Sequence, residues 1–219
     1  MPGKPTHADI PLSYFEYHAT YQEPLFDLLR FHSVVPQAVF RAFKSFNVSL
    51  ENVSYKQNPL NLSEVASTFT LFGGRFVFTS RLNSASLGVS NPNWSEVELV
   101  TKVVKAGMAA IVDGGVRLEK QRATIGMHLK PVSGSLKDFV SELARPIAKE
   151  LLGDDVRTYG VSVYRRDSTW VIDASVLDAT ALFVRIDHSH AADVAFEQIA
   201  SKLRTDEVRL LELLKLEVD

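Results

Sequence analysis

The same order of predicted elements occurs twice along this chain. Alternating apolar and polar residues predict consecutive β-hairpins that lead into a long amphipathic helix over residues 67–112, and the pattern returns over residues 156–217. We therefore expect an α+β fold of two duplicated halves, residues 12–115 and 116–219, after a loose lead-in at residues 1–11. Each half has the order strand, helix, strands, helix, with antiparallel sheet and helices packed on one face. The two halves are compatible with one continuous domain.

Local signals mark the turns and helix starts of this scheme. Gly73-Gly74 lies between two alternating runs, and both glycines tolerate positive φ, which favours a two-residue hairpin turn. Ser95 followed by Glu98 matches a capping box that opens the helix of the first half. A strand at residues 122–130 and a helix burying Phe139 to Leu151 are predicted to begin the second half.

The absence of cysteine limits the chemistry of the chain. Disulfides, thiolate catalysis and cysteine-ligated zinc or iron–sulfur sites are excluded. A formal net charge of −2 argues against a generally basic nucleic-acid coat protein, although it permits a local basic patch. No apolar run reaches the roughly 20 residues that cross a bilayer, and the N-terminus lacks an apolar signal segment. We expect a cytoplasmic protein with no membrane partner.

Common catalytic motifs do not occur in the sequence. It contains no G-x-S-x-G nucleophile elbow, no G-x-x-x-x-G-K-[ST] phosphate loop and no G-x-G-x-x-G dinucleotide loop. The paired Asp154 and Asp155 follow a predicted helix, where carboxylates are normally solvated. These observations favour a protein without a cofactor that is not an enzyme.

A dense polar cluster, Asp187-His188-Ser189-His190, precedes the last predicted helix. His188 and His190 would lie on one side of an extended segment, and with Asp193 they could bind a divalent metal ion in a metal-dependent enzyme. The alternative is a strand-to-helix junction in which Ser189 or His190 caps the helix and Asp193 complements its positive end. We favour capping, because the corresponding junction of the first half contains no histidine.

Residues 102–137 are locally basic. Phosphate groups could bind this stretch, which gives nucleic-acid binding as an alternative function, although a solvated linker between the halves is the favoured interpretation. Aromatic residues are not interleaved with these charges, so stacking on single-stranded bases is not indicated. The candidate nucleic-acid-binding residues are Lys102, Lys105, Arg117, Lys120 and Arg122.

The last predicted helix has an unusually wide apolar stripe. Burial against its own sheet explains most of the stripe, but a face this wide also suits a dimer interface. The leading functional hypothesis is therefore a non-enzymatic binding or assembly protein that associates with itself as a homo-oligomer or with a protein partner. The candidate interface residues are Phe196, Leu203, Leu210, Leu211 and Leu214.

Two segments of the chain resemble a known family. FVFTSRLNSASLGVSNPNWSEVELVTKVVKAGMAAI (residues 76–111) and ATIGMHLKPV (residues 123–132) are similar to the central segment of a sporadically distributed, functionally uncharacterised bacterial protein family. In that family a strand, an Asn/Pro/Trp-type turn, a helix and a further strand follow one another. The resemblance implies a bacterial source and no catalytic residue. The order of elements also resembles the TATA-binding-protein-like arrangement, in which two halves form a curved sheet backed by helices.

Overall fold

The computed structural model describes residues 6–30, 33–58, 60–132, 160–178 and 180–218. Within these residues the α-helices are α1 (Val34–Phe43), α2 (Val97–Asp113) and α4 (Phe196–Leu214). The strands are β1 (Thr6–Tyr21), β2 (Val53–Lys56), β3 (Ala66–Leu71), β4 (Phe76–Arg81), β5 (Ser84–Ser90), β6 (Leu118–Pro131), β7 (Val161–Tyr164), β8 (Ser168–Ala174), β9 (Leu182–Ala191) and β10 (Leu216–Glu217). Short 3₁₀ helices occur at Phe26–Leu29, Lys44–Phe46, Leu50–Asn52, Leu62–Glu64, Phe72–Gly74 and Trp94–Glu96.

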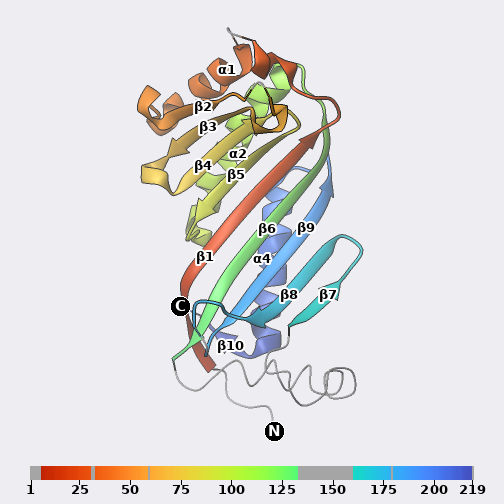
Figure 1. Cartoon of the computed structure of the whole chain (residues 1–219). Coiled ribbons are helices and arrows are strands. Elements are labelled where there is room, and N and C mark those ends of the chain that lie inside the picture. The colour runs from red at the N-terminus through yellow and green to blue at the C-terminus, as the bar shows by residue number, and fades with distance from the viewer. Residues whose placement is uncertain (1–5, 31–32, 59, 133–159, 179, 219) are drawn as a thin grey trace. The chain divides into compact units, whose positions relative to one another are not determined.

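The described strands form one ten-stranded sheet (Figure 1). Its order is β2-β3-β4-β5-β1-β6-β9-β8-β7, and β10 pairs with β1 in parallel off this path. The hairpin pairs β3–β4, β4–β5, β7–β8 and β8–β9 are antiparallel. The predicted α+β class with an antiparallel sheet is therefore confirmed. The helix predicted over residues 139–151 lies outside the described residues.

Contacts divide the chain into two compact units. The larger unit contains residues 15–123 and 189–200, and the smaller unit contains residues 1–14, 124–188 and 201–219. The long elements β1, β6, β9 and α4 each contribute residues to both units. This division differs from the boundary near residue 115 that the repeated element order suggested.

In the larger unit, α1 and α2 pack against one face of the sheet, and α2 lies behind β4 and β5 in Figure 1. The Phe43 ring of α1 lies 5.6 Å from the Phe69 ring and 5.2 Å from the Phe78 ring, both edge-on. Gly107 of α2 faces the same rings, and a Cβ built there would lie 2.6 Å from Phe78. A residue without a side chain therefore allows α2 to approach the strands closely.

In the smaller unit, alternate residues of β8 and β9 are buried. Trp170 and Ile172 of β8, and Val184 and Ile186 of β9, are at most 8% exposed. The Trp170 indole donates a hydrogen bond to Asp206 of α4, which places that helix on the same face of the strands. Packing one amphipathic helix on the strands buries the apolar face of the strands and the apolar stripe of the helix together.

Several boundaries differ from the sequence predictions. β1 begins at Thr6 rather than Leu12, so residues 6–11 of the predicted loose lead-in belong to a strand. The hairpin between β3 and β4 is longer than two residues, because Phe72, Gly73 and Gly74 all have positive φ and the closing pair is Leu71 with Phe76. No helix in the described part of the chain is both long and apolar enough to span a bilayer.

Candidate nucleic-acid interface

Four basic side chains gather on the sheet face of the larger unit that α1 and α2 leave uncovered. His18 lies on β1, Arg81 on β4, and Lys120 and Arg122 on β6. Arg81, Lys120 and Arg122 are exposed, and His18 is half-buried. We call these four residues the cationic cluster.

The alternation of strand residues directs the cationic cluster away from the helices. Tyr17 of β1 is buried and donates a 2.6 Å hydrogen bond to the side chain of Gln121 of β6. Because consecutive strand residues point to opposite faces, His18 and its neighbours Lys120 and Arg122 project to the other side. Along β4, Phe76, Phe78 and Ser80 are completely buried, which places Arg81 on the open face.

Electrostatics indicate that the members of the cluster are close to one another. The pKa of His18 is lowered from its usual value, first by burial and then by the positive charges of Arg81 and Arg122. Lys120 acts in the same direction, whereas Glu16 opposes it. Nearby cations that add to the effect of burial in lowering the pKa of a histidine indicate a locally positive surface.

Hydroxyl groups surround the cluster on the same face. Thr68 and Thr79 face each other across β3 and β4 with their hydroxyl oxygens 3.2 Å apart. The guanidinium of Arg81 donates a 3.3 Å hydrogen bond to the hydroxyl of Ser86 on β5. Cations interspersed with hydroxyls provide the donors that contact phosphate oxygens in protein–nucleic acid complexes.

The structure brings together only part of the predicted basic stretch. Lys120 and Arg122 belong to the cationic cluster. Lys102 is paired at 2.7 Å with Glu98, one turn earlier on α2. Lys105 is paired with Glu197, and Arg117 lies in the connection after α2, where its carbonyl accepts a hydrogen bond from Gln22. Residues 133–137 of the stretch lie outside the described residues.

Arg81 and His18 are members of the cluster that were not among the predicted binding residues. The alternation of β1 already predicts that His18 shares a face with Glu16. Nothing in the local sequence around Arg81 marks it as a partner of β6, because two other strands separate β4 from β6 in the sheet.

The polar cluster at residues 187–190 is strand and not a capping loop. β9 continues to Ala191, and His188 and His190 are both buried, as expected for alternate residues of one strand. Asp187 faces the opposite side, where it accepts hydrogen bonds from Thr124 at 2.6 Å and Arg185 at 2.9 Å. The favoured capping role for Ser189 or His190 is therefore wrong, because both residues are still paired in the sheet.

His188 lies in a buried polar network of the smaller unit. Its Nε2 is 3.0 Å from Oδ2 of Asp206, which also accepts a 3.2 Å hydrogen bond from Trp170. Arg165 approaches the same carboxylate oxygen at 3.6 Å. Asp193, the third ligand of the metal hypothesis, is exposed. No group of three or more potential metal ligands forms among the residues that the structure describes.

Most of the apolar stripe of α4 is buried within the protein itself. Phe196 is 5% exposed, and its ring contacts those of Phe15 and Tyr17 of β1 edge-on. Leu203, Leu210 and Leu214 are also buried, and Leu211 is half-buried. Four of the five candidate interface residues are thus core residues.

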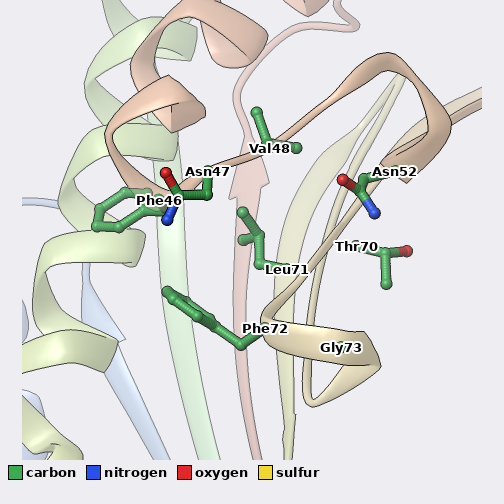
Figure 2. Close-up of a pocket in the computed structure, with 8 residues that line it drawn as sticks. All are labelled: Phe46, Asn47, Val48, Asn52, Thr70, Leu71, Phe72 and Gly73. Atoms are coloured by element: carbon green, nitrogen blue, oxygen red, sulfur yellow. The ribbon is translucent and has the colours of Figure 1, made fainter.

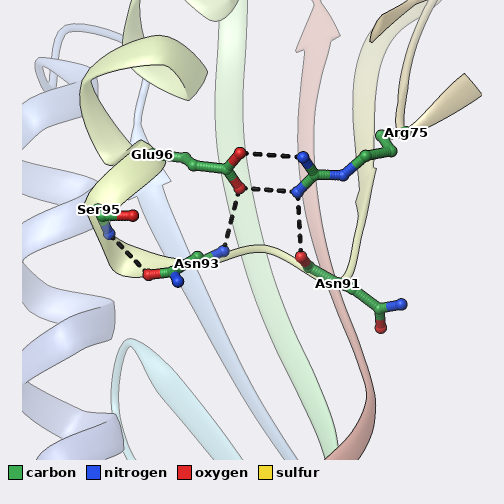
Figure 3. A network of polar contacts seen from close by, with 5 residues as sticks. All are labelled: Arg75, Asn91, Asn93, Ser95 and Glu96. Atoms are coloured by element: carbon green, nitrogen blue, oxygen red, sulfur yellow. Dashed lines mark hydrogen bonds and ion pairs between the residues drawn. The ribbon is translucent and has the colours of Figure 1, made fainter. Parts of the chain in front are cut away.

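A polar network fixes the turn before α2 (Figure 3). The guanidinium of Arg75 contacts both carboxylate oxygens of Glu96, at 3.0 and 2.7 Å, and donates to the carbonyl of Asn91 at 3.2 Å. Asn93 caps the helix by accepting a 2.9 Å hydrogen bond from the backbone of Ser95. The capping box therefore consists of Asn93 and Glu96 rather than the predicted Ser95 and Glu98.

Comparisons with known proteins add no functional information. No protein-family model matches the chain, and no curated protein matches it. The candidate interface therefore depends on the geometry and charge of the cationic cluster alone.

Proposed function

We propose that this protein binds nucleic acid through the cationic cluster on the open sheet face of its larger unit. The observation that supports this function best is the gathering of His18, Arg81, Lys120 and Arg122 from three strands onto the sheet face opposite α1 and α2. Phosphate groups are the polyanionic ligands that such a surface attracts most strongly, because each contact releases condensed counterions.

The cationic cluster is proposed to contact the phosphate backbone. The aromatic rings of the larger unit that contact one another, including Phe43, Phe69 and Phe78, lie on the helix-covered side of the sheet. Thr68, Thr79 and Ser86 accompany the cations on the open side. Hydroxyl and cationic groups mainly contact phosphate oxygens, and such contacts carry no direct sequence information. We therefore infer weak dependence on nucleic-acid sequence.

The proposed role is binding rather than catalysis. The overall charge of −2 makes a broad electrostatic attraction to nucleic acid unfavourable, so the interaction would be confined to the cluster. Under this proposal the protein holds nucleic acid on the surface of the cationic cluster and does not alter it chemically.

The test is a pair of charge-neutralised variants with the same change in net charge. Lys120→Gln/Arg122→Gln removes two cations from the cluster, and Lys102→Gln/Lys105→Gln removes two cations that are paired with Glu98 and Glu197 on helices. Binding of fluorescent 30-mer oligonucleotides, single- and double-stranded, is measured by anisotropy across a salt series. We expect the first variant alone to weaken binding, with the salt slope on the duplex smaller by about 2.

Two outcomes would reject this function. One is the absence of binding by the wild-type protein at low salt. The other is equal weakening by both variants, which would show that net charge and not the cluster drives association. Thermal unfolding of both variants checks that the fold is retained.

We also infer an internal duplication, as the repeated element order predicts. The strand order places β1 and β6 in the middle, with β5, β4 and β3 following β1 outward, and β9, β8 and β7 following β6. α2 is the next α-helix or strand after β5 along the chain, and α4 is the next after β9. This order is compatible with the TATA-binding-protein-like arrangement. An experimental structure in which the two halves do not superimpose would reject the duplication.

A further inference from the structure

A pocket of about 280 Å³ lies at the rim of the larger unit, beside the β3–β4 hairpin (Figure 2). Figure 2 shows Phe46 and Phe72 on one side of the opening and Asn52 and Thr70 on the other, with Leu71 between them. The volume is slightly below the range of about 300–1,000 Å³ that is usual for drug-sized ligands. The pocket is thus sized for a compact ligand.

The apolar part of the lining favours a flat ring. The Phe46 and Phe72 rings lie 6.1 Å apart at 65° to each other, and the Phe76 ring lies 5.0 Å from the Phe72 ring. Val48 and Leu71, both buried, add aliphatic surface. An aromatic ligand gains contact area and edge-to-face geometry from such walls.

The polar part of the lining consists of neutral groups. Two amides, Asn47 and Asn52, and the hydroxyl of Thr70 line the pocket, and no charged side chain does so among the residues described there. Asn52 uses its carbonyl oxygen to accept hydrogen bonds from Ser49, which leaves its amino group as a donor. The Asn47 side chain makes no hydrogen bond within the described part of the chain, so it can offer a donor and an acceptor side by side.

The backbone of the lining is unusual. Asn47 and Phe72 both have positive φ, at 59° and 52°, and Phe72 is followed by Gly73 at 66°. Asn47 adopts this region as the C-cap of the 3₁₀ helix Lys44–Phe46, a common position for left-handed asparagine, whereas a bulky aromatic residue such as Phe72 rarely adopts it. Figure 2 shows the Phe72 ring directed toward the same side of the pocket as Phe46.

We propose that this pocket binds an uncharged planar heteroaromatic ring with an adjacent donor and acceptor, the edge chemistry of a nucleobase. An asparagine amide matches such an edge with two hydrogen bonds, as it does with adenine, while aromatic side chains contact the ring. The ring could belong to a free nucleoside or to a base in a strand. The site does not involve the cationic cluster and stands independently of the backbone contact proposed above.

Adenosine is the probe, measured against the full chain by ligand-observed NMR and isothermal titration calorimetry. The test variant is Asn47→Gly, which removes the amide and keeps a residue that accepts positive φ. The matched control is Asn91→Gly, the same exchange at another left-handed asparagine with φ 47°. We expect saturable binding that Asn47→Gly weakens about tenfold or more, and that Asn91→Gly leaves unchanged.

A second arm uses a single-stranded oligoadenylate to distinguish the two sources of the ring. Binding of adenosine itself identifies a nucleoside site, whereas binding of the strand alone, weakened by Asn47→Gly, identifies a base within a strand. Either result supports the pocket. If neither ligand responds to Asn47→Gly, or the control weakens binding equally, the proposal is rejected. Loss of oligonucleotide binding in Lys120→Gln/Arg122→Gln with adenosine binding retained would separate the two sites.

Discussion

The Nε2 atom of His188 on β9 lies 3.0 Å from the Asp206 carboxylate on α4, with both side chains buried in the smaller unit. The same carboxylate accepts the indole N–H of Trp170, so one acidic residue satisfies donors from two strands. A buried polar network of this kind stabilises a unique arrangement of helix and strands only while every member is satisfied.

Removal of the Asp206 carboxylate should destabilise the smaller unit. Asp206→Ala leaves the Trp170 indole and the His188 ring without their acceptor, and the expected loss is about 2–4 kcal/mol in the free energy of unfolding. Urea unfolding followed by tryptophan fluorescence measures it. Asp193→Ala, at an exposed position, is the control and should change stability by less than about 0.5 kcal/mol. Equal effects of the two substitutions would contradict the role given to Asp206.

Stability should fall on acidification below about pH 6.5. Burial lowers the pKa of His188 from its usual value of 6.5, and the opposing effects of Asp206 do not cancel this shift. The unfolded state therefore binds a proton before the folded state does, so the contribution is fully present above pH 6.5 and is lost as the pH falls through the folded pKa. Unfolding midpoints at pH 7.5, 6.5 and 5.5 measure this loss.

His188→Gln should flatten that pH dependence only in part, because burial lowers the pKa values of His128 and His18 in the same direction. NMR titration of the His188 ring provides a direct check. Titration above 6.5 would show that the Asp206 charge outweighs burial and would reverse the sign.

Gly107→Ala should destabilise the larger unit although alanine favours helix. The new Cβ would lie 2.6 Å from the Phe78 ring and 3.0 Å from the Phe43 ring, and both rings are completely buried. Overpacking of about 1–3 kcal/mol then outweighs the helix-propensity gain of about 1 kcal/mol. Thermal unfolding tests this, with Gly88→Ala as the control, since nothing lies within 4 Å of a Cβ there. Phe78→Leu should restore part of the stability of Gly107→Ala, and a lack of any rescue would argue against this clash.

The turn before α2 should depend more on its cap than on its ion pair. Asn93→Ala removes the acceptor for the Ser95 backbone and should cost about 1 kcal/mol. Glu96→Gln breaks an exposed pair with Arg75 but keeps a side chain that can reach the Asn93 backbone, and should cost less than about 1 kcal/mol. Chemical unfolding of both variants gives the comparison. A larger loss for Glu96→Gln would mean that Arg75 and not the cap holds the turn.

Local periodicity was enough to predict most of the elements. The alternation around Gly73-Gly74 predicts β3 and β4, and the helical spacing from Val97 predicts α2. Errors arose where local signals compete. Asn93 and Ser95 are both good capping residues two positions apart, and the choice of Asn93 agrees with the contact of Glu96 with Arg75, which lies in the turn before β4.

Only half of the cationic cluster could be predicted from the sequence. Lys120 and Arg122 are close together in a basic stretch, whereas His18 and Arg81 lie about 40–100 residues away from them and belong to other strands. Lys102 and Lys105 belong to the same stretch but point from a helix, where carboxylates pair with them. Proximity along the chain therefore wrongly included Lys102 and Lys105 in the candidate site and missed His18 and Arg81.

The sequence by itself determined the α+β class, the alternation of the strands and the amphipathic helices, because these depend on the 2- and 3.6-residue periods of neighbouring residues. Only the tertiary structure decided which strands are neighbours, that the α4 stripe is buried within the chain, and that His188 meets Asp206. Those outcomes depend on pairing between segments distant in sequence. Such pairing is fixed by the packing of whole faces, which no local pattern contains.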